Sequence, residues 1–241
     1  MDLRPGGQAQ AILSFRLWAG FVAMCIGMFM AILDIQIVAS SLTNMGHALR
    51  IAPDELSWIQ TAYLIAEIIA IPLTGWLTRA LSLRILFFAA TLGFTLASLG
   101  CAASTTETTL IAARIVQGFC GGMLIPAVFT SVFALFPQNK HLLATTLAGS
   151  FAMIAPTIGP ALGGYMTQTF SWHWIFLINL PPGIAVSGVV LVCLRADRPN
   201  WRALRRIDYW TVLAAALFLG GLELLLKEGP GRDWGGPLVT A

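Results

Sequence analysis

Long runs of apolar residues alternate with short polar segments along the whole chain. A helix needs about 20 apolar residues to cross the roughly 30 Å hydrocarbon core of a bilayer. Seven runs are about that long, so the pattern predicts seven membrane-spanning helices joined by mostly short loops. Their expected bounds are 17–42, 56–77, 85–103, 110–136, 142–166, 174–194 and 209–226.

The composition also indicates a membrane protein. Of the 241 residues, 57% are hydrophobic and 10% are charged, whereas a soluble domain carries about 25% charged residues. So little polar surface cannot cover a core of this size in water. Arg4 and Arg16 precede the first run as they would in a signal peptide, but its apolar core exceeds the roughly 7–15 residues of such a peptide. We expect an uncleaved first helix.

Lysine and arginine in the loops predict the orientation of the helices. A cytoplasmic N-terminus places ten basic loop residues inside and three outside, and the reversed topology would reverse this bias. The inner group is Arg4, Arg16, Arg79, Arg84, Lys140, Arg195, Arg198, Arg202, Arg205 and Arg206, and the outer group is Arg50, Lys227 and Arg232. We therefore expect the N-terminus in the cytoplasm.

The predicted helices divide the chain into five segments. They are a cytoplasmic N-terminal segment (1–16), a six-helix bundle (17–194), a cytoplasmic linker (195–208), a seventh helix (209–226) and an outer loop (227–241). A seventh helix with no partner after it is an unusual end for a bundle, so we expect the natural protein to continue past Ala241.

Cysteine, histidine and net charge argue against metal, enzyme and nucleic-acid functions. The cysteines lie in apolar runs, where they serve as small hydrophobic side chains, and no Cys-x-x-Cys motif occurs. The histidines fall in three loops on both sides of the membrane, so they cannot converge on a metal ion or a catalytic triad. The net charge of +3 is small, and its basic residues mark topology rather than a polyanion site. These residues are Cys25, Cys101, Cys120, Cys193, His47, His141 and His173.

Two opposite charges lie inside predicted helices, where each costs about 2.5–3.5 kcal/mol on insertion scales. Asp34 in the first helix and Arg114 in the fourth lie at similar depths near the outer surface, which favours an ion pair. Gln117 follows Arg114 by three residues on the same helix face, where it can help satisfy the guanidinium or contact a substrate. The pair is interpreted as a proton- or substrate-coupling site, with a purely structural ion pair as the alternative.

Glu67 lies near the middle of the second predicted helix, with no basic residue evident at its own depth. Partial desolvation favours the neutral, protonated form of a carboxyl group at such a position. That behaviour suits a proton carrier. The alternative is a protonated acid that is hydrogen-bonded within the bundle.

Small residues recur every four positions in the fifth helix, at Ala155, Gly159 and Gly163. Such spacing lines one helix face and lets two helix backbones approach closely. Pro156 and Pro160 remove backbone donors and are expected to bend the helix. The pattern suits a protein whose halves rock against each other, or simple tight packing. Gly118, Gly121, Gly122 and Pro126 in the fourth helix predict a second close contact.

These residues resemble the motifs of the major facilitator superfamily, in its branch of fourteen-helix drug:proton antiporters of the EmrB/QacA type. The resemblance covers essentially the whole chain, and the matching motifs occur in order at the expected helices. They are Leu33–Val38 around Asp34, Leu110–Gly118 around Arg114, Gly159–Gly164 of the antiporter motif, Trp172–Pro181 at the start of the sixth helix, and Arg205–Asp208 and Gly231–Trp234 flanking the seventh.

The chain departs from the family pattern in two places. In the segment from Gly75 to Arg84 between the second and third helices, Arg79 stands where the superfamily has aspartate and Ser82 where it has glycine. The acidic member of the usual gating charge network is therefore missing. The antiporter motif, which includes Gly164, opens with Ala155 where glycine is typical.

The resemblance implies a fold and a function. The fold is an all-α membrane bundle, the first six-helix half of a major facilitator plus its seventh helix. The function is proton-coupled efflux of amphipathic drugs or toxic compounds across the bacterial inner membrane, driven by the proton motive force without a cofactor. A periplasmic adaptor and an outer-membrane channel are implied partners, beside the lipid bilayer and a small amphipathic substrate. The alternatives are another exporter or importer of the superfamily, or a channel or sensor.

Overall fold

The computed structural model describes residues 5–53, 55–194 and 209–228. The predicted linker 195–208, the motifs Arg205–Asp208 and Gly231–Trp234, and the loop beyond residue 228 lie outside these ranges. Helices account for nearly all of the described residues, and no strand occurs among them. They are α1 (Pro5–Leu49), α2 (Ser57–Leu81), α3 (Leu83–Ala102), α4 (Glu107–Leu135), η1 (Gln138–Lys140), α5 (His141–Thr169), α6 (Trp174–Leu177), α7 (Leu180–Cys193) and α9 (Tyr209–Glu228).

The helices agree with the predicted apolar runs. Within the described residues, six helical segments are long and apolar enough to cross a membrane, with α6 and α7 together forming the sixth. The predicted seventh helix is present as α9, and its crossing of the membrane stays a prediction. The structure therefore has the all-α architecture expected from hydrophobicity.

Two boundaries differ from the sequence prediction. Helix α1 is longer than the predicted 17–42 at both ends and spans 45 residues, because helical hydrogen bonding continues past the apolar run. The sixth run is not one regular helix but is interrupted at Ile178 and Asn179, between α6 and α7. Pro181 and Pro182 follow directly and have no backbone N–H to donate into the preceding turn, which explains the interruption.

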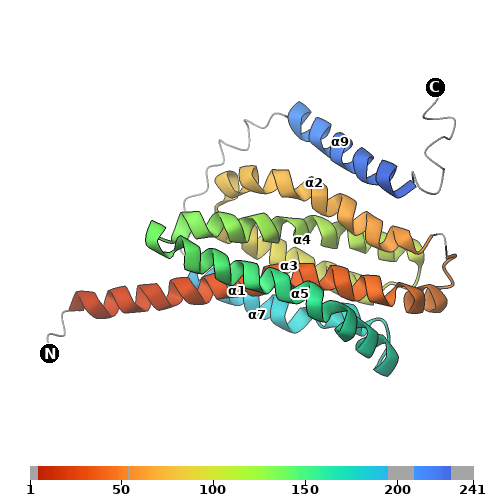
Figure 1. Cartoon of the computed structure of the whole chain (residues 1–241), viewed down its shortest axis with the longest axis horizontal. Coiled ribbons are helices and arrows are strands. Elements are labelled where there is room, and N and C mark those ends of the chain that lie inside the picture. Colours follow the sequence, from red (N-terminus) through yellow and green to blue (C-terminus); the bar gives the residue numbers. More distant parts are fainter. Residues whose placement is uncertain (1–4, 54, 195–208, 229–241) are drawn as a thin grey trace.

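The helices lie side by side as a bundle, with α9 along the outside of α2 (Figure 1). Helix α2 packs mainly on α4, α1 on α5, and α3 on both α4 and α7. Apolar side chains of α1, α3 and α4 fill the centre of the bundle, among them Met24, Phe87 and Phe94. This packing places α1, α2, α3, α4 and the α6–α7 interruption around one common interior.

Glycines bring α4 against the backbone of α2. A β-carbon at Gly118 would collide with the carbonyl oxygen of Tyr63, and one at Gly122 would lie 2.6 Å from the carbonyl oxygen of Glu67. Along this contact the two helices are in register, and Tyr63 and Glu67 of α2 each lie opposite an α4 glycine 55 positions later. This confirms the close contact predicted from the glycines of the fourth helix.

The small residues of α5 pack against α1. Ala155, Gly159 and Gly163 are buried on one face, and β-carbons at the two glycines would collide with Gln36 and Ser40 of α1. The predicted close approach is confirmed, and α5 is continuous through both prolines. Pro160 is exposed, and a β-carbon at Gly164 would meet nothing within 4 Å. These two motif residues therefore take no part in the contact with α1.

The bounds predicted for the second and third helices leave residues 78–84 as a loop, and this prediction is wrong. Helix α2 continues to Leu81 and α3 begins at Leu83, so Ser82 alone connects them. Its φ of 81° lies in the left-handed region that favours glycine, in agreement with the family pattern. The Ser82 hydroxyl compensates in part, because it accepts a hydrogen bond from the Ile85 amide at the start of α3.

Substitution of Gly122 by alanine tests the contact between α2 and α4. The added β-carbon would press on the α2 backbone, so we expect a loss of stability of about 1–3 kcal/mol, as for other overpacked sites. Thermal unfolding of the purified protein in detergent measures it. Gly188→Ala is the matched control, because a β-carbon there meets nothing within 4 Å. Equal losses in the two variants would contradict the proposed register.

Candidate functional site

Asp34 and Arg114 form a salt bridge in the interior of the bundle. The Arg114 Nη1 donates to Asp34 Oδ2, and both side chains are fully buried. Asp34 lies in the second half of α1, and Arg114 lies two turns into α4. The ion pair predicted from their depths is confirmed.

Gln117 completes a triangle with the two charges. Its amide oxygen accepts a hydrogen bond of 2.8 Å from Arg114 Nη1, and its amide nitrogen donates to Asp34 Oδ1 at 3.0 Å. The spacing of three residues places both α4 side chains on the same face. The predicted contact of Gln117 with the guanidinium is confirmed, and the second contact ties it to the carboxylate as well.

Two further neutral side chains hold the carboxylate. Asn179 donates to Asp34 Oδ1 at 2.9 Å from the interruption between α6 and α7. Ser98 of α3 accepts a hydrogen bond of 2.8 Å from the Gln117 amide and one of 3.4 Å from Asn179. All these side chains are buried. Buried ions are tolerated when such bonds replace their hydration, so this network makes the ion pair compatible with an apolar interior.

Arg114 makes its remaining contacts with α2. Its Nε donates to the carbonyl oxygen of Ile59 at 3.3 Å, and its Cζ lies 4.2 Å from the centre of the Tyr63 ring. Stacking of a guanidinium on an aromatic face is favourable where water is excluded. The Nη2 atom is buried and has no hydrogen-bond partner in the described part of the chain. The arginine therefore keeps one nitrogen, with its two N–H groups, unused.

Glu67 lies apart from this network but within its electrostatic field. It is 6% exposed and belongs to the face of α2 that packs on α4. The charges of Arg114 and Asp34 both act on it. The sequence suggested no basic residue at its depth, and the structure shows Arg114 beyond Tyr63, toward the N-terminal end of α2. Glu67 makes no hydrogen bond or ion pair with any described residue.

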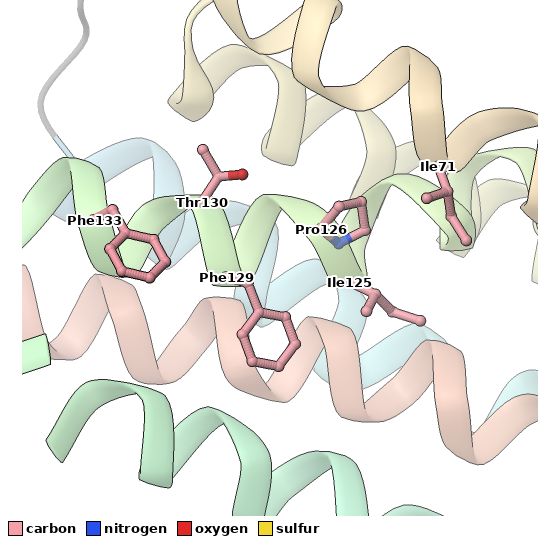
Figure 2. A pocket seen from close by; sticks show the side chains of 6 residues that line it. All are labelled: Ile71, Ile125, Pro126, Phe129, Thr130 and Phe133. Carbon is pink, nitrogen blue, oxygen red and sulfur yellow. The ribbon is translucent and has the colours of Figure 1, made fainter. Parts of the chain in front are cut away.

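A pocket of about 470 Å³ lies further along the contact between α2 and α4. Figure 2 shows side chains from successive turns of α4, with Ile71 reaching toward them from α2. Phe129 and Phe133 provide aromatic surface, and Thr130 is polar. The lining residues are Ile71, Ile125, Pro126, Phe129, Thr130 and Phe133. The composition suits the apolar part of a small molecule.

The other predicted site residues do not join the charge network. Gly75 and Arg79 are exposed in the last turns of α2, and Arg84 is half-buried in the first turn of α3. Neither arginine makes an ion pair with a described residue. The α5 motif serves packing on α1, as described above. Within residues 5–53, 55–194 and 209–228, no three histidine, cysteine, aspartate or glutamate side chains could hold a metal ion.

Sequence reasoning missed Ser98, Asn179 and Tyr63 as site residues. Ser98 continues a polar stripe at spacings of four and three residues, with Thr91 and Thr95, on one face of α3. That stripe was a usable signal. Asn179 is the single amide side chain within the sixth apolar run, which was a second signal. Nothing in the sequence indicated that Tyr63 stacks on an arginine 51 positions later.

Comparison with known proteins places these residues in a family context. A family model described as Major Facilitator Superfamily matches residues 24–229. The chain is 45% identical over 217 residues to the colistin resistance protein EmrB of Acinetobacter baumannii, a match that covers 90% of this chain and 42% of that protein. It is 33% identical over 213 residues to the multidrug export protein EmrB of Escherichia coli K12, covering 88% and 41%. The chain thus spans less than half the length of these relatives.

Solved structures share the fold at low sequence identity. The proton:xylose symporter XylE matches with a TM-score of 0.66 and 14% identity over 93% of this chain and 56% of that chain. A bacterial homologue of the human lysosomal transporter Spinster, in an inward-facing conformation, matches with a TM-score of 0.65 and 12% identity over 78% and 44%. At 12–14% identity these two likenesses concern the fold alone.

Substitution of Asn179 by alanine tests the support of the carboxylate. Asp34 would lose one of its donors, and a hydrogen bond to a charged group contributes about 1.5–3 kcal/mol. We expect the free energy of unfolding, measured in mixed micelles, to fall by an amount in that range. Ser187→Ala is the control, since the buried Ser187 hydroxyl bonds only to Gly183 within its own helix.

A double-mutant cycle separates this interaction from general packing. In the Asp34→Asn background the charge is absent, so Asn179→Ala should cost less than half as much as in the wild type. An unchanged cost would show that Asn179 does not act through Asp34.

Proposed function

The chain belongs to the major facilitator superfamily, and on this basis we propose that it forms part of a proton-coupled exporter of amphipathic compounds. The observation that supports this most is the buried pair of Asp34 and Arg114 with its neutral hydrogen-bond partners. A carboxylate held by one guanidinium and two amides can be neutralised by a proton without losing all of its bonds. Protonation would then change which helices are held together.

Coupling follows from the helices that the network joins. Asp34 belongs to α1, Arg114 and Gln117 to α4, and Asn179 to the interruption before α7. A proton on Asp34 removes the charge attraction between Asp34 and Arg114, so it would shift the equilibrium between the two conformations of the carrier. The proton motive force would supply the energy, and no cofactor is required.

The proposed substrate is a small amphipathic molecule such as a drug. The pocket along α2 and α4 offers apolar and aromatic surface, which would accept the apolar part of such a molecule. The relatives named above are a colistin resistance protein and a multidrug export protein. Export rather than import also follows the resemblance of the α5 residues to the antiporter motif.

The proposed location is the bacterial inner membrane, with the N-terminus in the cytoplasm. The distribution of lysine and arginine supports this orientation. A periplasmic adaptor and an outer-membrane channel are proposed as partners because the chain resembles the EmrB-type permeases. The family and the structural neighbours are transporters, and we propose no enzymatic activity.

Efflux of ethidium from energised cells that express the full-length protein tests the coupling role. We expect Asp34→Asn and Arg114→Ala each to lower efflux by about tenfold or more, because each removes one member of the pair. Membrane insertion is checked by immunoblotting of membrane fractions. Glu55→Gln is the control, since Glu55 is an exposed acid outside the charge network. Efflux at the wild-type rate in both variants would remove the assigned site.

A further inference from the structure

Two ionisable side chains in this bundle, one basic and one acidic, have groups without hydrogen-bond partners among the described residues. The Nη2 of Arg114 is fully buried and donates to nothing. Glu67, also buried, makes no hydrogen bond or ion pair. A buried donor without a partner costs free energy, so the unpaired Nη2 atom directs attention to Glu67, an acid on the neighbouring helix.

The two groups lie on the same side of α2. Ile59, Tyr63 and Glu67 follow one another at intervals of four residues and share one helix face. Arg114 bonds to the carbonyl of Ile59 and stacks on Tyr63, and Glu67 lies one turn further, a rise of about 6 Å. Helical side chains lean toward the N-terminus of their helix, so a glutamate at position 67 extends back toward the turn of Tyr63. A rotation of the Arg114 side chain can therefore bring Nη2 to Glu67.

We propose that Glu67 is a second carboxylate partner of Arg114, and that the guanidinium exchanges between Asp34 and Glu67 during transport. The proposal rests on the proposed function, in which Asp34 takes up a proton. It makes Glu67 the group that receives the arginine when Asp34 is neutral. The Tyr63 ring provides a surface along which the guanidinium can move without being exposed to lipid.

The exchange balances in protons and charge. In the described state Asp34 is the carboxylate, its Oδ2 accepts from Arg114, and Glu67 carries a proton. In the second state a proton binds Asp34 Oδ2, the bond to Arg114 breaks, Glu67 loses its proton, and its carboxylate accepts from Arg114 Nη2. One proton enters at Asp34 and one leaves from Glu67, while Arg114 keeps its charge throughout.

The surroundings of Asp34 permit this exchange. Gln117 and Asn179 both donate to Oδ1 and not to Oδ2, the atom that Arg114 occupies. A proton on Oδ2 therefore leaves both amide bonds in place. The protonated acid remains anchored to α4 and to the α6–α7 interruption after the arginine has left.

The other charged groups near α2 face elsewhere. Helix α9 meets α2 where Gly220 approaches Ile65 and Ile69, on the opposite side of α2 from Glu67 because two residues turn a helix by about 200°. Its Glu223 and Lys227 are therefore directed to that side, and Lys227 lies over the Trp58 ring. From α1 and α4, Asp34 and Arg114 are the charges that act on Glu67. On α3, Arg84 lies in the first turn, at the far end of α2 from Tyr63.

Infrared spectroscopy of the purified protein in lipid nanodiscs at neutral pH tests the exchange. Wild type should show a protonated-carboxyl band that is absent from Glu67→Gln, which assigns the band to Glu67. Asp34→Asn leaves Arg114 without its first partner, so we expect the arginine to turn to Glu67 and the band to be lost. Asp34→Ser is made in parallel, so that the test does not depend on the folding of one variant. In Asp34→Asn/Arg114→Gln the band should return.

Persistence of the Glu67 band in a folded Asp34 variant would overturn the proposal, as would absence of the band from wild type. Efflux by the full-length protein gives a second readout, and we expect Glu67→Gln to lower it by about tenfold, with partial recovery in Glu67→Asp. Efflux at the wild-type rate in Glu67→Gln would also overturn it. If the band responds as expected but Asp34→Asn exports normally, the proposed function fails and the exchange stands.

Discussion

A buried ion pair in an apolar bundle is stable only while both charges keep enough hydrogen bonds. Removing an aspartate and an arginine from water costs several kcal/mol for each ion. Here the cost is offset by donors and acceptors from Gln117, Asn179 and the Ile59 carbonyl. These groups come from α2, α4 and the α6–α7 interruption, so the requirement to satisfy two charges fixes how the helices of the bundle meet.

The glycines of α4 help to satisfy the charge of Arg114 on the side that faces α2. Arg114 can reach a backbone carbonyl of α2 only because the two helices are in close contact at Gly118 and Gly122. A backbone carbonyl inside a helix normally accepts one hydrogen bond from an amide of the same helix. Its oxygen has a second lone pair, which can accept another hydrogen bond, here from the charged Arg114 side chain. The close packing of α2 on α4 is therefore also what allows the charge of Arg114 to be satisfied.

Hydrophobicity predicted the six spans well, and the cost of intramembrane charge identified Asp34 and Arg114 as a pair. Sequence alone did not place Asn179, since its bonds to Asp34 and Ser98 depend on how the sixth span packs against α1 and α3. It also predicted a loop where Ser82 alone joins two helices. Local periodicity determines helices, whereas partners far apart in the chain depend on packing.

The close packing of the sixth span on its neighbours also explains how an asparagine there reaches Asp34. Within a regular helix, a residue projects its side chain from a rigid cylinder at a fixed angle. At the junction of α6 and α7, Asn179 keeps right-handed helical dihedral angles, and Gly183, one turn on, packs tightly against Thr95 of α3. The close approach brings Asn179 within reach of Ser98 on α3 and of Asp34 on α1. Asn179 thus donates to the central carboxylate from a junction that lies buried among the other helices.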